Sequence, residues 1–482
     1  MSEGLGFHKQ MRDVSLRLWC MVGHIFLCVS ASSLLDVVDD ASQVGYWAVS
    51  REYGFLPKLK QTPFSNSISR DYPVLFERDF SLTFQDRRWF LDYVSTVLRV
   101  PEDIELQSLT EPQLEDVFHG SAFIAAMFIR NFHLQFPSEP IIKLPKAIAR
   151  PLFLAAKKFD RVPALGYASS VLDNCEPLSR SSSAGSSWVP RWRASRTVSS
   201  TQSENGFYGA HCEVEQVLAK SVYAALQFLS CVESRGCEAE FALKYLHDMS
   251  DGIRDGIATI KRIQRYVSSS DFFLVARPYL KYKPRNVSVI YEQADHNCKD
   301  VLFKDVPGPT GAMTSTIPFL DAVVGVSVSD PKLAALLNGF RDFFPRNHRH
   351  LIEHADRSFS HHVLPFIQSH WELRFAFDDV ITALAEWRAA HIILTEDYIM
   401  KHMPKEAIGT GNTPFHRYLC HHFFENLRVR LNSSSTAVAI PPLCIQELRD
   451  SSSRHDSSIL SVTWESLARM SRVFFVQVGL VR

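Results

Sequence analysis

Apolar residues recur every three or four positions through most of the segment 204–431. This spacing places them on one face of an α-helix, and such a face is buried against its neighbours. The clearest stripe consists of Leu246, Met249, Ile253, Ile257, Ile260, Ile263 and Val267. Further helices are expected over 213–232, 331–344, 375–400 and 413–431, and no alternating run long enough for a sheet is evident in 204–431. These patterns predict an all-α fold.

Length and composition exclude several classes of protein. With 482 residues the chain can hold two or three domains and a large core. The 52 basic and 52 acidic side chains balance, so there is no electrostatic case for binding nucleic acid or an anionic membrane. The nine cysteines form no Cys-x-x-Cys pair. Their odd number argues against a disulfide framework and suits a reducing compartment.

Residues 9–32 begin with basic side chains, continue with an apolar stretch and end with small residues. This is the layout of a signal peptide or an anchor. Arg17 and His24 leave the stretch short of the ~20 apolar residues of a spanning helix. Two interpretations stay open, a signal or anchor in 9–32 or an extension without a targeting role. We expect a cytoplasmic protein with no firm membrane association.

A second helical stripe, within 375–400, contains a histidine. Its members are Leu384, Trp387, His391, Leu394 and Tyr398. An imidazole on a buried helix face needs a partner, and an axial iron is one that suits an apolar pocket. The alternative is a core histidine satisfied by a hydrogen bond.

The motifs around His391 resemble those of the indoleamine 2,3-dioxygenase family, haem enzymes that open the indole ring of tryptophan. They span 49–431 and include YGFLP at 53–57, PALGY at 163–167, VLDN at 171–174, FFLVARPYL at 272–280, RDFFP at 341–345, RAAH at 388–391 and GTGNT at 409–413. The resemblance implies an all-helical protein that binds haem b and uses dioxygen.

The resemblance also implies which residues hold the cofactor. His391 would be the axial ligand of the haem iron, and hence the metal-binding residue. Arg388 would pair with Asp321 and brace the helix that carries His391. Gly311, in the loop 308–315, would lie against the haem.

Other matched positions imply a substrate site. Arg277 would bind the substrate carboxylate, because a guanidinium offers a two-pronged charged fork. Phe272 would contact the substrate, and we count it with His391 and Arg277 as catalytic. Thr410 would close over the amino-acid end of the substrate.

The resemblance further implies that Phe207, Tyr167 and Ser170 line the distal side of the pocket. Phe207 would also contact the haem. His211 replaces a small hydroxyl residue that is usual in mammalian members of the family. It would hydrogen-bond either dioxygen or the indole N–H, or it has no role.

Three positions depart from the family pattern and favour a haem protein that does not cleave the ring. Gly206 stands where a tryptophan is usual, and Tyr282 stands where a glycine is usual. Pro309 lacks a backbone N–H in a loop expected to approach the haem. The histidine pairs elsewhere (His348 with His350, 361–362 and 421–422) lack metal-site spacing, and we expect them at the surface or at helix ends.

We therefore predict five segments: an N-terminal extension (1–36), a small helical domain (37–175), a Ser/Arg-rich mobile loop (176–203), a large haem-binding domain (204–431) and a Ser-rich extension (432–482). The leading hypothesis is oxidative cleavage of the indole C2–C3 bond of L-tryptophan or a related indole. The product would be of the N-formylkynurenine type, as in the kynurenine pathway or a secondary-metabolite branch.

The expected partners are the indole, dioxygen and an external reductant, with the chain acting as a monomer. One rival is a haem protein that binds dioxygen without ring cleavage. Another is a helical scaffold without haem, which requires that no cavity adjoin His391.

Overall fold

The computed structural model describes residues 46–57, 63–77, 79–178, 191–234, 236–281, 287–303, 306–403, 409–411 and 415–431. The expectations for the extensions 1–36 and 432–482, for the signal or anchor in 9–32 and for Tyr282 lie outside these residues. Within them helices dominate, so the predicted all-α class is confirmed. No described helix combines the length and apolar character that crossing a bilayer would need.

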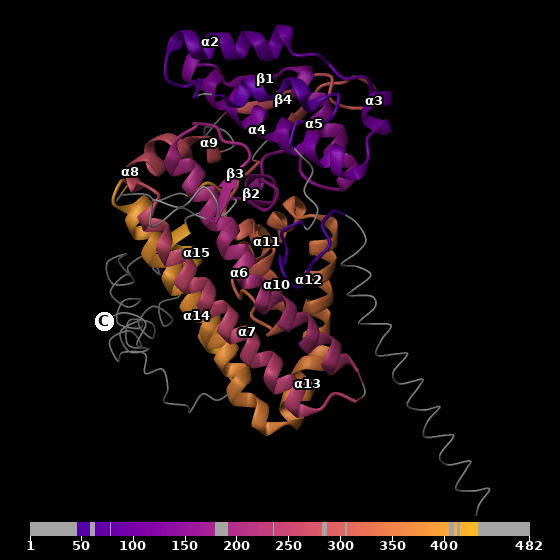
Figure 1. Ribbon diagram of the computed structural model, residues 1–482, viewed down its shortest axis with the longest axis vertical. Helices are drawn as coiled ribbons and strands as arrows, with labels where there is room; N and C mark the ends of the chain where they lie inside the picture. The colour runs from indigo at the N-terminus through magenta and orange to yellow at the C-terminus, as the bar shows by residue number, and fades with distance from the viewer. Residues whose placement is uncertain are drawn as a thin grey trace, which may run out of the picture.

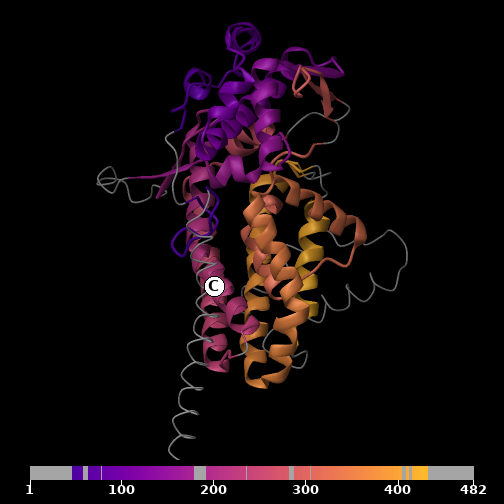
Figure 2. The same ribbon diagram turned by 90° about the vertical axis from the view of Figure 1, so that its right-hand side faces the viewer.

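Long helices that run side by side form the lower part of the molecule (Figures 1 and 2). The longer ones are α6 (Gln202–Glu233), α7 (Ala239–Ile260) and α14 (Arg374–Thr395). Around them lie α8 (Ser269–Asp271), α9 (Arg277–Leu280), α10 (Thr316–Val323), α11 (Pro331–Phe340), α12 (Arg346–Ser358), α13 (Leu364–Ser369) and α15 (Phe415–Val429). Helix α7 packs against both α6 and α14.

The apolar stripe of α7 is the reason for this packing. Leu246, Met249 and Ile253 are completely buried, and burying one such side chain contributes roughly 1.5–3 kcal/mol. Helix α6 begins at Gln202 rather than at residue 213, because the Thr201 hydroxyl accepts a hydrogen bond from the N–H of Glu204 and caps the helix there.

The upper part of the molecule contains α2 (Phe84–Asp92), α3 (Asp103–Ser108), α4 (Glu111–Gln135) and α5 (Lys146–Phe159). Helix α4 is its centre and is buried from Leu114 to Ile129. The remaining short helical turns, of the 3-10 or π type, are η1 (Ser69–Asp71), η2 (Pro73–Phe76), η3 (Tyr93–Val97), η4 (Ala168–Leu172), η6 (Lys261–Arg265), η7 (Phe272–Ala276), η8 (Gly311–Met313), η9 (Arg341–Phe343), η10 (Phe359–Val363), η11 (Trp371–Leu373) and η12 (Glu396–Met400).

Two short strands lie within 204–431, where no sheet was expected. Strand β4 (Ser288–Tyr291) pairs in parallel with β1 (Ile141–Leu144) and antiparallel with β5 (Val301–Phe303), in the order β1-β4-β5. The expectation was wrong because strands of three or four residues are too short for a visible alternation. The pairing also attaches part of 204–431 to the upper part of the molecule (Figure 1).

The predicted mobile loop is partly ordered. Residues 179–190 lie outside the described ranges, but β3 (Trp192–Ala194) pairs antiparallel with β2 (Cys175–Pro177). Arg196 is buried and forms an ion pair with Asp116 of α4. Serine-rich composition was misleading here, because one buried arginine with an acidic partner anchors the segment.

Four cysteines are paired among the residues that the structure describes, contrary to the expectation from their odd number. The sulfur atoms of Cys175 and Cys212 lie at bonding distance, as do those of Cys231 and Cys237. An odd total leaves at least one cysteine over, but it does not prevent the others from meeting in the fold. Among the described residues Cys298 is free and exposed.

Candidate functional site

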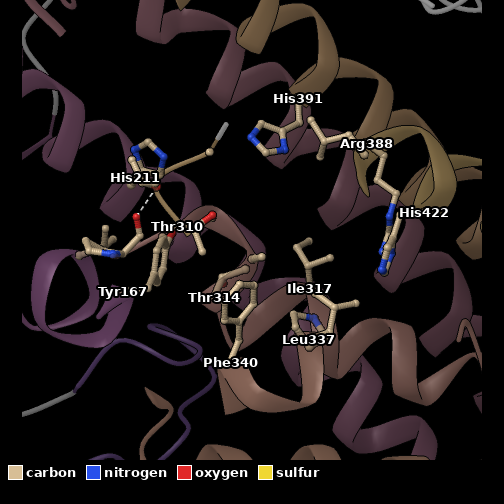
Figure 3. A pocket seen from close by; sticks show the side chains of 18 of the residues that line it. Tyr167, His211, Thr310, Thr314, Ile317, Leu337, Phe340, Arg388, His391 and His422 are labelled. Atoms are coloured by element: carbon tan, nitrogen blue, oxygen red, sulfur yellow. Dashed lines mark hydrogen bonds between the residues drawn. The ribbon is translucent and has the colours of Figure 1, made fainter. Parts of the chain in front are cut away.

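A cavity of about 440 Å³ opens between α6, α10, α11 and α14, and it lies in the size range of small-molecule and cofactor sites (Figure 3). All the site residues expected from the sequence line it, although they come from distant parts of the chain. They are Tyr167, Ser170, Phe207, His211, Phe272, Arg277, Gly311, Asp321, Arg388, His391 and Thr410. The structure therefore brings the expected set together around one space.

His391 projects from α14 into this cavity (Figure 3). Burial, followed by the nearby His211 and Arg388, lowers the pKa of His391 to about 4. The imidazole is therefore neutral near pH 7, the form that can ligate a metal. Neither ring nitrogen has a hydrogen-bond partner among the described residues. The scaffold interpretation required a His391 without a cavity, and this condition is not met.

Gly311 leaves the space beside the His391 ring open. A Cβ atom built on Gly311 would lie 3.7 Å from Cε1 and 3.9 Å from Nε2 of His391. Haem is a flat, largely apolar group that one histidine nitrogen can hold. The neutral imidazole, the cavity beside it and the absence of a side chain at Gly311 fit such a group. Among the described residues no three His, Cys, Asp or Glu side chains converge as they would around a bare metal ion.

Arg388 holds α14 to two neighbouring helices. Its Nη2 donates to Asp321 Oδ2 of α10 at 2.5 Å and lies 3.1 Å from His422 Nδ1 of α15. All three side chains are buried. The contact between Arg388 and Asp321 implied by the resemblance is present, and His422 is an additional member that we did not expect. Placing His422 at the surface or at a helix end was wrong.

A π-turn puts Phe272 and Arg277 on the same wall of the cavity. In η7 the N–H of Arg277 donates to the carbonyl of Phe272, so residues five apart lie one above the other. Burial lowers the pKa of Arg277 to about 10, and its guanidinium stays charged at neutral pH. The Phe272 ring lies 4.7 Å from that of Phe207.

His211 projects from the third turn of α6. Its Nδ1 lies 2.8 Å from the carbonyl oxygen of Phe207, which can only accept a hydrogen bond. Nδ1 therefore carries the proton, and Nε2 is left with a lone pair. Burial lowers the pKa of His211, which keeps the ring neutral. Its ring also contacts those of Phe207 and Tyr167.

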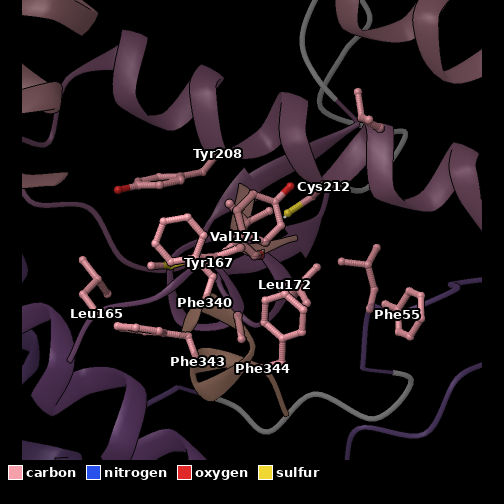
Figure 4. Packing of buried hydrophobic residues seen from close by; sticks show 14 of the residues in the cluster. Phe55, Leu165, Tyr167, Val171, Leu172, Tyr208, Cys212, Phe340, Phe343 and Phe344 are labelled. Atoms are coloured by element: carbon pink, nitrogen blue, oxygen red, sulfur yellow. Dashed lines mark hydrogen bonds between the residues drawn. The ribbon is translucent and has the colours of Figure 1, made fainter. Parts of the chain in front are cut away.

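Two loops meet beside the cavity. Thr410 Oγ1 donates to the Pro309 carbonyl at 2.6 Å, and the N–H of Gly308 donates to the Thr410 carbonyl at 3.2 Å. Pro309 thus contributes an acceptor to this contact, and its missing N–H is not needed for it. Tyr167, Phe340 and Phe344 belong to the same cluster of buried apolar side chains (Figure 4).

Gly206, one of the departures from the family pattern, does not line the cavity. A Cβ atom at this position would stand 2.9 Å from the carbonyl oxygen of Tyr266. A larger residue would therefore displace the backbone that follows η6. Gly206 is explained by packing between α6 and that segment, outside the cavity.

Sequence reasoning missed Glu215, whose buried carboxylate also lines the cavity. A signal for it existed, because Phe207, His211 and Glu215 are spaced by four residues and share one face of α6. His348 was misjudged as well: it is fully buried in α12 and not at the surface.

Comparison with known proteins places these residues in context. The family model described as indoleamine 2,3-dioxygenase matches residues 44–430. Indoleamine 2,3-dioxygenase 1 of Mus musculus is 23% identical over 290 residues, which cover 56% of this chain and 69% of the relative. The indoleamine 2,3-dioxygenase of Saccharomyces cerevisiae is 22% identical over 384 residues, which cover 73% of this chain and 79% of the relative. A myoglobin of Haliotis madaka is 21% identical over 274 residues, which cover 54% of this chain and 65% of the relative.

Proposed function

The chain belongs to the indoleamine 2,3-dioxygenase family, and we propose that it is a haem dioxygenase that cleaves the indole C2–C3 bond of L-tryptophan or a related indole. The observation that carries the proposal is the convergence of His391, Phe272, Arg277 and His211 on one cavity. The product would be of the N-formylkynurenine type, and an external reductant would keep the iron ferrous.

His391 would hold the haem through its neutral imidazole. When bound, haem supplies the iron that activates dioxygen toward the closed-shell indole. The protein's own contribution begins with α14, whose position is held by Arg388 and Asp321. Bracing of this kind keeps a ligand ring oriented toward its metal.

Arg277 and Phe272 would bind the two ends of the amino acid. The charged guanidinium suits the carboxylate, and the paired rings of Phe272 and Phe207 offer an apolar wall to the indole. Thr410 lies on the loop contact at the cavity, and its hydroxyl would accept a hydrogen bond from the amino-acid end.

His211 would accept the indole N–H. The bond from Nδ1 to the Phe207 carbonyl leaves Nε2 as an acceptor, and an acceptor cannot donate to dioxygen. Because burial lowers the pKa of His211, the ring is a weak base that orients the N–H without removing its proton. Replacing His211 with serine should therefore weaken binding of indoles that carry an N–H more than binding of N-methylated indoles.

Purified protein from cells supplied with a haem precursor tests the proposal. With L-tryptophan, dioxygen and a reductant, the wild type should form the N-formylkynurenine product, identified by mass. His391→Ala should abolish stoichiometric haem, while Arg277→Ala should keep haem and lose product. Arg265→Ala removes an exposed arginine and serves as the control. Full haem retention in His391→Ala would exclude His391 as the ligand.

A second function is favoured by one comparison: the Haliotis madaka relative is named a myoglobin. The same cavity would then bind haem and dioxygen reversibly without ring cleavage. A haem spectrum with reversible dioxygen binding, and no product from tryptophan or other indoles, would support this function over the dioxygenase.

A further inference from the structure

Glu215 is a buried acid in the cavity wall that the proposed function does not use. It lies on the face of α6 that also carries Phe207 and His211, and its side chain is 3% exposed. Burial raises the pKa of Glu215, and hydrogen bonds from three hydroxyl groups oppose that effect. Among the described residues, its hydrogen-bond partners are the hydroxyl groups of Tyr167, Thr314 and Thr316.

Three hydroxyl groups converge on this carboxylate. Tyr167 Oη and Thr314 Oγ1 each lie 2.8 Å from Oε1, and Thr316 Oγ1 lies 2.5 Å from Oε2. An ionised carboxylate is an acceptor only and can accept from all three. A buried polar network that is fully satisfied in this way holds its members in one arrangement.

The three donors come from two segments that shape the cavity. Tyr167 immediately precedes η4, and its ring contacts His211. Thr314 and Thr316 bracket the junction between the loop 308–315 and α10, and the N–H of Thr316 also donates to Thr314 Oγ1. The same loop presents Gly311 to His391. Figure 3 shows Tyr167, Thr310 and Thr314 gathered on one side of the cavity, with His391 on another.

We infer that Glu215 is a positioning residue, whose carboxylate holds Tyr167 and the segment 308–316 against α6 and so sets the shape of the cavity wall that faces His391. The tethering follows from the hydrogen bonds alone. Its consequence for an indole in the cavity rests on the proposed function.

Hydrogen–deuterium exchange of the full chain tests the tether without haem or turnover. Glu215→Gln replaces one acceptor oxygen with an NH2 donor that faces hydroxyl donors, so exchange of segment 308–316 should rise at least about tenfold. Glu213→Gln is the matched control, because Glu213 is a buried carboxylate on the same helix that pairs with Arg262 instead. Unchanged exchange in Glu215→Gln, or an equal rise in Glu213→Gln, would overturn the tether.

Threonine variants keep the test decisive if Glu215→Gln does not fold. The double variant Thr314→Val, Thr316→Val removes two hydroxyl groups at nearly constant shape and should raise exchange of 308–316. The double variant Thr314→Ser, Thr316→Ser keeps the hydroxyl groups and should match the wild type. Equal exchange in the valine and serine variants would contradict a tether through hydroxyl groups.

The spectrum of carbon monoxide bound to the haem-loaded protein tests the shape of the cavity wall. Glu215→Gln should shift or split the C–O stretching band, whereas Glu213→Gln should leave it as in the wild type. An unchanged band beside raised exchange would mean that Glu215 supports the fold without shaping the cavity, contrary to the inference. A protein that binds no haem would refute the proposed function, and the exchange experiment would still decide the tether.

Discussion

Acidification should destabilise the folded protein through His348. This side chain has no exposed surface, and its ring packs edge-on against Phe55 at 4.5 Å and Trp47 at 5.4 Å. Its Nδ1 lies 2.9 Å from the Ser315 hydroxyl. Burial lowers the pKa of His348 to about 3, so the folded protein holds a neutral imidazole throughout the mildly acidic range.

The sign of the effect follows from which state binds the proton first. In the unfolded chain the imidazole has its ordinary pKa of about 6.5, so the unfolded state gains the proton as pH falls below that value. The stability linked to His348 is therefore complete above pH ~6.5 and declines as pH falls toward 3. Between pH 8 and pH 5 the expected loss is about 2 kcal/mol of unfolding free energy.

Urea unfolding at the two pH values, followed by tryptophan fluorescence, measures this loss. Other groups titrate in the same range, so the informative quantity is the difference between the wild type and His348→Gln, which cannot titrate there. The wild type should lose about 2 kcal/mol more than His348→Gln. His350→Gln removes an exposed histidine of the same helix and should behave like the wild type. Equal losses in wild type and His348→Gln would refute the reasoning.

Three further outcomes are expected. Asp321→Asn and Arg388→Met should each lower the unfolding free energy by about 3–5 kcal/mol, because each leaves one charge of a buried ion pair without its opposite charge; urea unfolding of the double variant should show a loss well below their sum. Gly54→Ala should cost at least about 1 kcal/mol, since its φ is +58° and a Cβ would lie 3.1 Å from the Cα of Ala219; an unchanged thermal midpoint would contradict this. Haem at a hundredfold excess over its dissociation constant should stabilise the wild type by about 2.7 kcal/mol and leave His391→Ala unaffected, as differential scanning calorimetry would measure.

The helices and the buried cavity residues could be predicted from the sequence for a physical reason. A stripe such as Leu246, Met249 and Ile253 reports burial directly, because only a helix places residues three and four apart on one face. The stripe through His391 likewise predicted a helix with an inward imidazole. That Arg277 and Thr410 line the same cavity depended on the family resemblance, since local spacing does not relate distant segments.

What sequence reasoning missed depends on contacts between distant segments. Strand β4 forms by pairing with β1. The segment around Arg196 is held in place by the ion pair with Asp116. The burial of His348 also depends on contacts with distant segments. Its spacing of four residues from the buried Ile352 on α12 was nevertheless a usable signal. Glu215 is explained only by three hydroxyl groups that the fold gathers from other segments.

The most direct test of the account is the fate of labelled dioxygen. Haem-loaded wild-type protein, reduced and supplied with L-tryptophan under ¹⁸O₂, should yield an N-formylkynurenine product that carries both labelled atoms. Haem-loaded Arg277→Ala protein should form no labelled product. Haem-loaded protein that binds dioxygen reversibly and leaves every indole offered unchanged would contradict the dioxygenase proposal and support the ligand-binding alternative.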